Sequence, residues 1–356
     1  QEGYLMDLGY FIFLSSGLFL GWSLGANDAA NIFGTAVGTK MVRFRTAALI
    51  SSIFIILGAV FTGAGASKTL GELGSIDALA GAFMVALAAA VTIYWMVKLG
   101  LPVSTSQAIV GAIVGWNIYS GKPTEITILS QIVGTWIICP VLSGIIAILL
   151  YYLIRSRLKK SKIHILRRDT YTRIGLILVG AFGAYALGAN NIANVMGVFV
   201  DSSPFQALRL PGGFSLNSTQ VLFLIGGIAI SSGVFTYSHR VMNTVGNNLM
   251  SMSPIVAWIA VFSQALVLFL FASQGLKNLL ETNGFPSLPL VPVSSSQAII
   301  GAVIGIGIAK GGRDIHWGLL GHIALGWITT PVIATLLCFI SLFFLENVFN
   351  LTVYLP

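Results

Sequence analysis

The chain has 356 residues, of which 56% are hydrophobic and only 8% are charged. Soluble globular domains carry about 25% charged residues, so this composition excludes an ordinary water-soluble enzyme. The formal net charge of +8 does not indicate nucleic-acid binding, because eight of the nineteen basic residues lie in one short stretch between apolar segments. We therefore expect a multi-pass membrane protein that contacts lipid and has no nucleic-acid partner.

Apolar runs that are long enough to cross a bilayer core of about 30 Å recur along the whole chain. We expect eight spans, at residues 9–27, 46–64, 79–98, 126–154, 173–190, 219–237, 253–273 and 316–346. Two shorter apolar stretches, 102–119 and 292–309, contain Gly and Pro and lie near the lower length limit of about 17 residues for a span. Their length does not decide whether they cross the membrane or re-enter it.

The basic residues predict the orientation, because Lys- and Arg-rich connections face the cytoplasm. We place the basic stretch 155–173 inside and count each short stretch as one traverse, which gives five traverses per half. Fifteen of the nineteen basic residues then face inward. The four that face outward are Lys68, Lys122, Arg209 and Lys277. The sequence thus predicts about ten traverses with both termini outside.

Two motifs occur once in each half of the chain. Leu24–Gly34 aligns with Leu187–Gly197, and Pro102–Gly111 aligns with Pro292–Gly301. Because each half crosses an odd number of times, the second copy would be inverted relative to the first. Inverted repeats with interrupted helices or re-entrant-type hairpins are typical of secondary transporters, so we predict an all-α polytopic membrane protein of that kind. The predicted division is a first repeat at 1–154, a basic cytoplasmic linker at 155–172 and a second repeat at 173–356.

The first motif places a carboxylate and two carboxamides inside an apolar segment. An ionisable residue such as Asp28 costs at least ~2.5 kcal/mol at that depth and indicates a functional site by default. Gly25 and the neighbouring alanines let the backbone unwind or approach a ligand closely. Side-chain and backbone oxygens suit a small hard cation such as Na⁺. The predicted Na⁺ ligands are Asn27, Asp28, Asn31, Ser104, Asn190, Asn194 and Ser294.

A structural role competes with this interpretation, because Asn and small residues also hold membrane helices together by packing and hydrogen bonds. That alternative stays open for Asn31 and for Asn194 taken singly. It does not suit Asp28, since neither copy of the motif contains a Lys or Arg that could offset its negative charge. We expect a cation or a proton to neutralise Asp28.

The second motif predicts a helix that begins inside the membrane. Pro102 or Pro292 ends the preceding segment, and Ser104 or Ser294 is a suitable N-cap. A helix N-terminus offers free N–H groups and a partial positive charge to an anion. Hydroxyls that bond back to their own helix are the alternative, which suits a lone Ser better than a string that occurs twice. The predicted anion ligands are Asp28, Ser104, Thr105, Ser106, Gln107, Asn191, Ser294, Ser295, Ser296 and Gln297.

Together, the two motif pairs resemble those of the PiT family of inorganic phosphate transporters, and the resemblance covers essentially the whole chain. It implies two inverted repeats and uptake of inorganic phosphate coupled to Na⁺ or H⁺. One position departs from the family pattern, since many members carry Asp where this chain has Asn191. The number and placement of the coupled ions therefore do not carry over directly.

The charge balance favours coupling to cations. Phosphate carries one to two negative charges near neutral pH, Asp28 adds another, and the motifs contain no basic residue. We therefore expect Na⁺-coupled phosphate symport into the cell across the plasma or inner membrane by alternating access, with no other cofactor. A homodimer is a further hypothesis.

Several other functions compete with this expectation. They are H⁺ coupling, sulfate or another oxyanion as cargo, and an ion channel, which would usually need rings of like ligands around a pore. An enzyme is disfavoured, because the motifs contain no nucleophile beside a histidine base.

Overall fold

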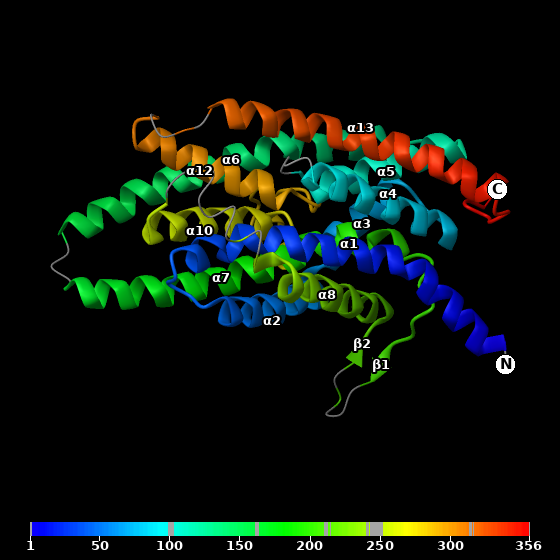
Figure 1. Ribbon diagram of the computed structural model, residues 1–356, viewed down its shortest axis with the longest axis horizontal. Coiled ribbons are helices and arrows are strands. Elements are labelled where there is room, and N and C mark those ends of the chain that lie inside the picture. The colour runs from blue at the N-terminus through cyan, green and yellow to red at the C-terminus, as the bar shows by residue number, and fades with distance from the viewer. Residues whose placement is uncertain are drawn as a thin grey trace.

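The computed structural model is built almost entirely from helices that run along the long axis of the molecule (Figure 1). The described residues are 2–98, 103–160, 164–209, 213, 215–239, 242, 252–312, 315 and 317–355. The helices are α1 (Glu2–Gly38), α2 (Phe44–Thr62), α3 (Ala64–Leu73), α4 (Leu79–Lys98), α5 (Thr105–Ser120), α6 (Ile126–Lys160), α7 (Ile165–Met196), the 3-10 helix η1 (Gly197–Phe199), α8 (Ser218–Thr236), α10 (Pro254–Leu270), α11 (Gln274–Thr282), α12 (Ser295–Ala309) and α13 (Trp317–Asn347). Strands β1 (Leu208–Arg209) and β2 (Ser215–Leu216) form a small antiparallel hairpin.

The expected membrane spans are confirmed. Within the described residues, seven helices are long and apolar enough to cross a membrane, and α10 and α11 form an eighth span if they count as one helix bent by 71°. Each of the eight predicted spans falls on one of these helices. The two short apolar stretches correspond to α5 and α12, which have 16 and 15 residues. The chain is a multi-pass helical membrane protein.

The first motif does not unwind the helix that carries it. Helix α1 continues without a break through Gly25 and Asp28, and α7 continues through the second copy. A Cβ atom added at Gly25 would lie 1.8 Å from the carbonyl oxygen of Ile230 in α8, and one at Gly188 would lie 2.1 Å from that of Ile55 in α2. The expectation of unwinding is therefore wrong, and these glycines instead allow direct contact between helix backbones.

In the view of Figure 1, helices α1, α2, α7 and α8 lie together, the helix pairs α5–α13 and α6–α12 lie above them, and α4 and α10 lie between the two groups. We call α1, α2, α7 and α8 the motif bundle, and α5, α6, α12 and α13 the cap bundle. In the cap bundle, Gly111 of α5 faces Pro331 of α13, and Gly301 of α12 faces Pro140 of α6. A Cβ atom added at Gly111 would lie 2.3 Å from the carbonyl oxygen of Pro331, and one added at Gly301 would lie 2.1 Å from that of Pro140. Corresponding residues of the two halves thus make corresponding contacts.

The two ends of the molecule differ in which connections they carry. Both termini lie at one end, which we call the terminus end (Figure 1). The C-terminus of α6 and the N-terminus of α7 lie at the opposite end, which we call the linker end (Figure 1). This arrangement agrees with an odd number of traverses in each half. Four residues used in the predictions lie outside the described residues, namely Pro102, Lys162, Arg240 and Arg313.

Candidate functional site

The predicted site residues gather where α1 and α7 of the motif bundle meet the N-termini of α5 and α12 of the cap bundle. Hydrogen bonds join α1 to α12 and α7 to α5. All the predicted residues are buried except Asn27 and Asn31, which are half-buried. Residues from both halves of the chain therefore form one polar cluster inside an apolar helical protein.

The two helix starts have the predicted caps. The Ser104 hydroxyl accepts a hydrogen bond from the backbone N–H of Gln107 at 3.3 Å, and the Ser294 hydroxyl accepts one from the N–H of Gln297 at 3.2 Å. Both serines have extended backbone conformations, as N-caps do. The other N–H groups of each first turn have no acceptor within their own helix, so each helix start favours a negative charge.

One half of the cluster, the Asp28 half-site, joins α1 to α12. The side-chain amide of Asn31 donates to the Asp28 carboxylate at 3.5 Å and to the Ser296 hydroxyl at 3.4 Å. The Asn27 amide donates to the same carboxylate oxygen at 3.2 Å. The Asn31 amide also lies 3.5 Å from the Ser295 hydroxyl, as a third acceptor. The carboxylate is thus held entirely by neutral donors.

The other half, the Asn191 half-site, joins α7 to α5 by equivalent residues. The Asn194 amide donates to Asn191 Oδ1 at 3.0 Å and to the Ser106 hydroxyl at 2.9 Å. These residues align with Asn31, Asp28 and Ser296 of the first half-site. The same network is therefore built twice, with a carboxylate in one copy and a carboxamide in the other.

Asn190 holds the segment that precedes α12. Its Nδ2 donates to the carbonyl oxygen of Val291 at 3.1 Å, and its Oδ1 accepts from the N–H of Val293 at 2.8 Å. The Ser106 hydroxyl donates to the carbonyl oxygen of Val293 at 3.1 Å. The backbone of Val291 and Val293 is thus a part of the site that was not predicted, although Pro292 between them marks the break.

Several polar atoms of the cluster have no hydrogen-bond partner among the described residues. They are Oε1 of Gln107, Oε1 of Gln297, Nδ2 of Asn191 and Oδ1 of Asn194. Buried polar groups are nearly always hydrogen-bonded in native proteins. A cluster of such atoms beside two helix N-termini is what a site for a small polar ligand requires.

The electrostatics of the cluster are unusual for an anion site. In the described part of the chain, Asp28 is the one buried acid, and no Lys or Arg is buried. An anion bound at the two helix starts would therefore lie near a carboxylate without any basic side chain. Cations bound among the Asp and Asn oxygens would restore neutrality.

Comparisons with known proteins identify the family. The model of the phosphate transporter family matches residues 24–171, 159–338 and 285–353. A protein of Methanocaldococcus jannaschii named as a phosphate permease is 29% identical over 89% of this chain and 91% of its own length. The chloroplastic inorganic phosphate transporter 2-1 of Arabidopsis thaliana is 23% identical over 90% of this chain and 69% of its own. A solved structure titled as the sodium-dependent phosphate transporter matches with a TM-score of 0.74 and 22% identity, over 95% of this chain and 98% of that one.

Proposed function

Because the chain belongs to the phosphate transporter family, we propose that it carries inorganic phosphate into the cell together with Na⁺, by alternating access in the plasma or inner membrane. The chain is a membrane transporter and not an enzyme. The relatives named above are phosphate permeases or transporters, and the structural relative is named as sodium-dependent. The fold and the family therefore indicate a phosphate transporter, and the site supports Na⁺ as the coupled ion.

The observation that carries the proposal is a buried carboxylate beside two helix N-termini without a buried Lys or Arg in the described residues. Phosphate and Asp28 together bring two or three negative charges into a medium of low dielectric constant, where unpaired charge is costly. Bound Na⁺ ions offset that charge. The anion is then stable in the site only with its cations, which makes the coupling obligatory.

The residues divide into two proposed roles. The N–H groups, hydroxyls and amides at the starts of α5 and α12 hold the phosphate, through Ser104, Thr105, Ser106, Gln107, Ser294, Ser295, Ser296 and Gln297. Asn191 contributes its side-chain amide, and Asp28 accepts a hydrogen bond from the O–H group of the phosphate. The Na⁺ ligands are Asn27, Asp28, Asn31, Ser104, Asn190, Asn194 and Ser294. Asn190 also fixes the backbone before α12, so its oxygen is positioned by the same hydrogen bonds.

The unpartnered amide oxygens favour phosphate over sulfate as the cargo. Oε1 of Gln107 and Oε1 of Gln297 are acceptors and lie beside the two helix starts. Hydrogen phosphate has an O–H group that can donate to such an oxygen, whereas sulfate has none near neutral pH. Bound hydrogen phosphate would therefore leave fewer of these two amide oxygens without a hydrogen bond than bound sulfate would.

The position of the site at the boundary between two bundles supports alternating access. The hydrogen bonds from α1 to α12 and from α7 to α5 all cross from the motif bundle to the cap bundle. Movement of one bundle against the other would therefore expose the site to one side and then the other. The paired glycine contacts of the two halves support a division into inverted repeats at 1–154 and 173–356, joined by the linker 155–172.

Uptake of radiolabelled phosphate into proteoliposomes tests the proposal. An inward Na⁺ gradient should drive accumulation, and an equal K⁺ gradient should not. An imposed pH gradient without Na⁺ is the second arm, because accumulation there would assign the coupling to protons. A tenfold excess of sulfate is the third arm and should leave uptake unchanged. Uptake that ignores both gradients would contradict coupled transport, and conductance in planar bilayers would favour a channel.

A further inference from the structure

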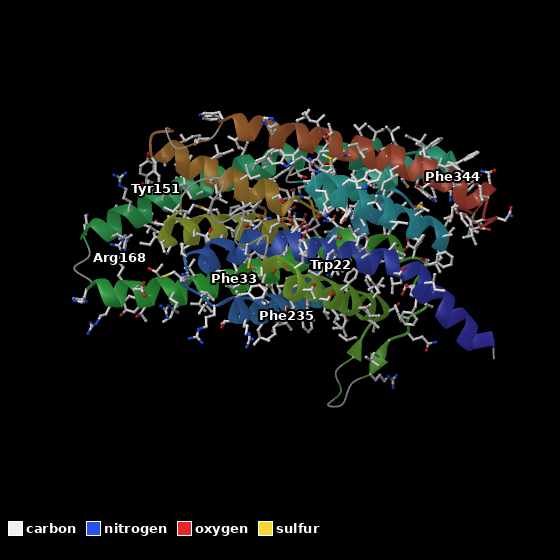
Figure 2. The ribbon with its side chains drawn as sticks, in the orientation of Figure 1. Trp22, Phe33, Tyr151, Arg168, Phe235 and Phe344 are labelled. Atoms are coloured by element: carbon white, nitrogen blue, oxygen red, sulfur yellow. The ribbon has the colours of Figure 1, made fainter. Side chains whose placement is uncertain are left out.

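A cavity of about 470 Å³ opens at the linker end, between α6, α7, α10 and the residue that follows α12. Three basic residues line it, Arg155 of α6, Arg168 of α7 and Lys310, which caps α12. Tyr151 and Arg168 mark this end of the molecule in Figure 2. Helices from both halves of the chain thus bring positive charge to one place that the transport site does not use.

The charge in this cavity is uncompensated. Among the described residues that line it there is no acid, and none of the three basic residues forms an ion pair. The guanidinium of Arg155 lies 5.8 Å from the centre of the Tyr151 ring. At the terminus end the lysines are paired instead, in Lys68–Glu72, Lys122–Asp77 and Lys277–Glu281. At the linker end Asp169 pairs with Arg173, which leaves the three basic residues of the cavity without an ion pair among the described residues, so the cavity attracts an anion.

The start of α10 adds to this attraction. Ser253, its N-cap, and Val256 in its first turn both line the cavity. The N-terminus of a 17-residue helix carries a partial positive charge and free N–H groups. Basic side chains and a helix N-terminus together match a phosphate or phosphodiester group.

An apolar groove of about 210 Å³ leads away from Arg168, one of these three basic residues. Arg168, Ile154, Leu158 and Ile255 line both the cavity and the groove, and Trp258 closes one wall of the groove. The groove runs along α7 as far as Gly175. A free phosphate ion has no apolar group that could occupy this groove. A hydrocarbon chain joined to a phosphodiester would bury the apolar surface of the groove favourably.

We propose that this cavity binds the phosphodiester headgroup of an anionic phospholipid, with one acyl chain in the adjoining groove. Basic pockets between transmembrane helices at the cytoplasmic face bind anionic headgroups in this way, and the linker end is the end at which the predicted cytoplasmic residues lie. Arg168 belongs to the motif bundle, and Arg155 and Lys310 belong to the cap bundle. A bound headgroup would therefore bridge the two bundles at the opposite end from the paired lysines.

Native mass spectrometry of the full-length protein tests the proposal with phosphatidylglycerol as the probe. The cavity variant is Arg155→Gln, Arg168→Gln and Lys310→Gln together. The matched control removes three exposed charges of the same end that do not line the cavity, by Arg157→Gln, Lys160→Gln and Arg167→Gln. We expect the cavity variant to bind phosphatidylglycerol at least about tenfold more weakly than wild type, and the control to bind it about as well. Each single cavity substitution is measured as well, so that the test does not depend on the folding of the triple variant.

Two further probes decide what occupies the cavity. Phosphatidylcholine has the same phosphodiester and acyl chains without a net charge, and we expect the cavity substitutions to leave its binding unchanged. Inorganic phosphate at millimolar concentration should not displace bound phosphatidylglycerol. Equal loss of phosphatidylglycerol from the cavity variant and the control would show a general charge effect and overturn the proposal. Displacement by inorganic phosphate would overturn it in favour of free phosphate as the occupant.

Discussion

The Asp28 half-site and the Asn191 half-site are built from aligned residues yet differ in charge and in tightness. Asn194 is fully buried and makes hydrogen bonds of 2.9 and 3.0 Å. Asn31 is half-buried and makes bonds of 3.4 and 3.5 Å. The neutral half-site therefore has the shorter hydrogen bonds, although Asn191 Nδ2 and Asn194 Oδ1 have no partner among the described residues, and the charged half-site is held more loosely.

This difference indicates a division of labour between two copies of one motif. A carboxylate held by long bonds to neutral donors keeps oxygen lone pairs for a cation. A carboxamide with short bonds to its neighbours contributes more to the stability of the helix packing. We infer that the first copy provides the main ion site and that the second copy chiefly joins the two bundles.

The substitution Asp28→Asn should have the largest effect. It removes the one buried charge of the described residues and leaves the shape of the side chain nearly unchanged. We expect Na⁺-driven phosphate uptake into proteoliposomes to fall by at least about tenfold, which corresponds to about 1.4 kcal/mol of lost cation binding. A monodisperse elution profile serves as the folding control. Wild-type uptake in this variant would remove Asp28 from the ion site.

The reverse change, Asn191→Asp, should give the second half-site a charge as well. A second carboxylate near the phosphate weakens anion binding unless another cation enters with it. We expect uptake at low Na⁺ to fall several-fold and to recover at high Na⁺, with a steeper dependence on Na⁺ concentration. The conservative change Asn191→Gln, which adds no charge, is the matched control. An unaltered Na⁺ dependence in Asn191→Asp would show that the second half-site is remote from the anion.

Replacing Asn31 and Asn194 by alanine compares how much each asparagine contributes to the stability of the protein. Asn194→Ala removes two short buried hydrogen bonds and should lower the free energy of unfolding by about 1–3 kcal/mol. Asn31→Ala removes longer bonds from a half-buried side chain and should cost less than about 1 kcal/mol. Thermal unfolding of both variants without phosphate measures this difference. Equal losses of stability would contradict the structural role assigned to the second half-site.

Substitutions of Gln107 and Gln297 test whether the two helix starts contribute equally to phosphate binding. Gln107 and Gln297 each have an unpartnered Oε1 at a helix start, so Gln107→Met and Gln297→Met should act similarly. We expect each to raise the KM for phosphate by less than about tenfold, as the loss of one hydrogen bond does. Each should also make uptake more sensitive to competing sulfate. A change in maximal rate without a change in KM would instead indicate a role in movement.

The sequence predicts local features of this protein well. The caps at Ser104 and Ser294 follow from a Pro, a Ser and a small-residue run within a few positions, and both form as expected. The spans follow from hydrophobic length. Helices α3 and α11 were not predicted, because they have 10 and 9 residues and fall below the length of a span.

Long-range contacts could not be predicted in the same way. The bonds of Asn190 reach residues 101 and 103 positions away, and no local pattern encodes them. Gly25 was expected to permit unwinding or close approach to a ligand, but it instead allows contact with the backbone of Ile230 in a helix of the other half. The residues of the cluster were identified because the motifs repeat, whereas their unequal bond lengths depend on the packing of both bundles.

Equilibrium binding of radiolabelled phosphate to the purified protein, in Na⁺ and in choline, tests the central claim most directly. The claim is that a site with a buried carboxylate and no basic side chain holds phosphate only together with cations. We expect the Kd for phosphate to be at least about tenfold lower in Na⁺ than in choline at the same ionic strength, and we expect Asp28→Asn to remove most of this difference. Equally tight phosphate binding in choline and in Na⁺ would contradict the claim.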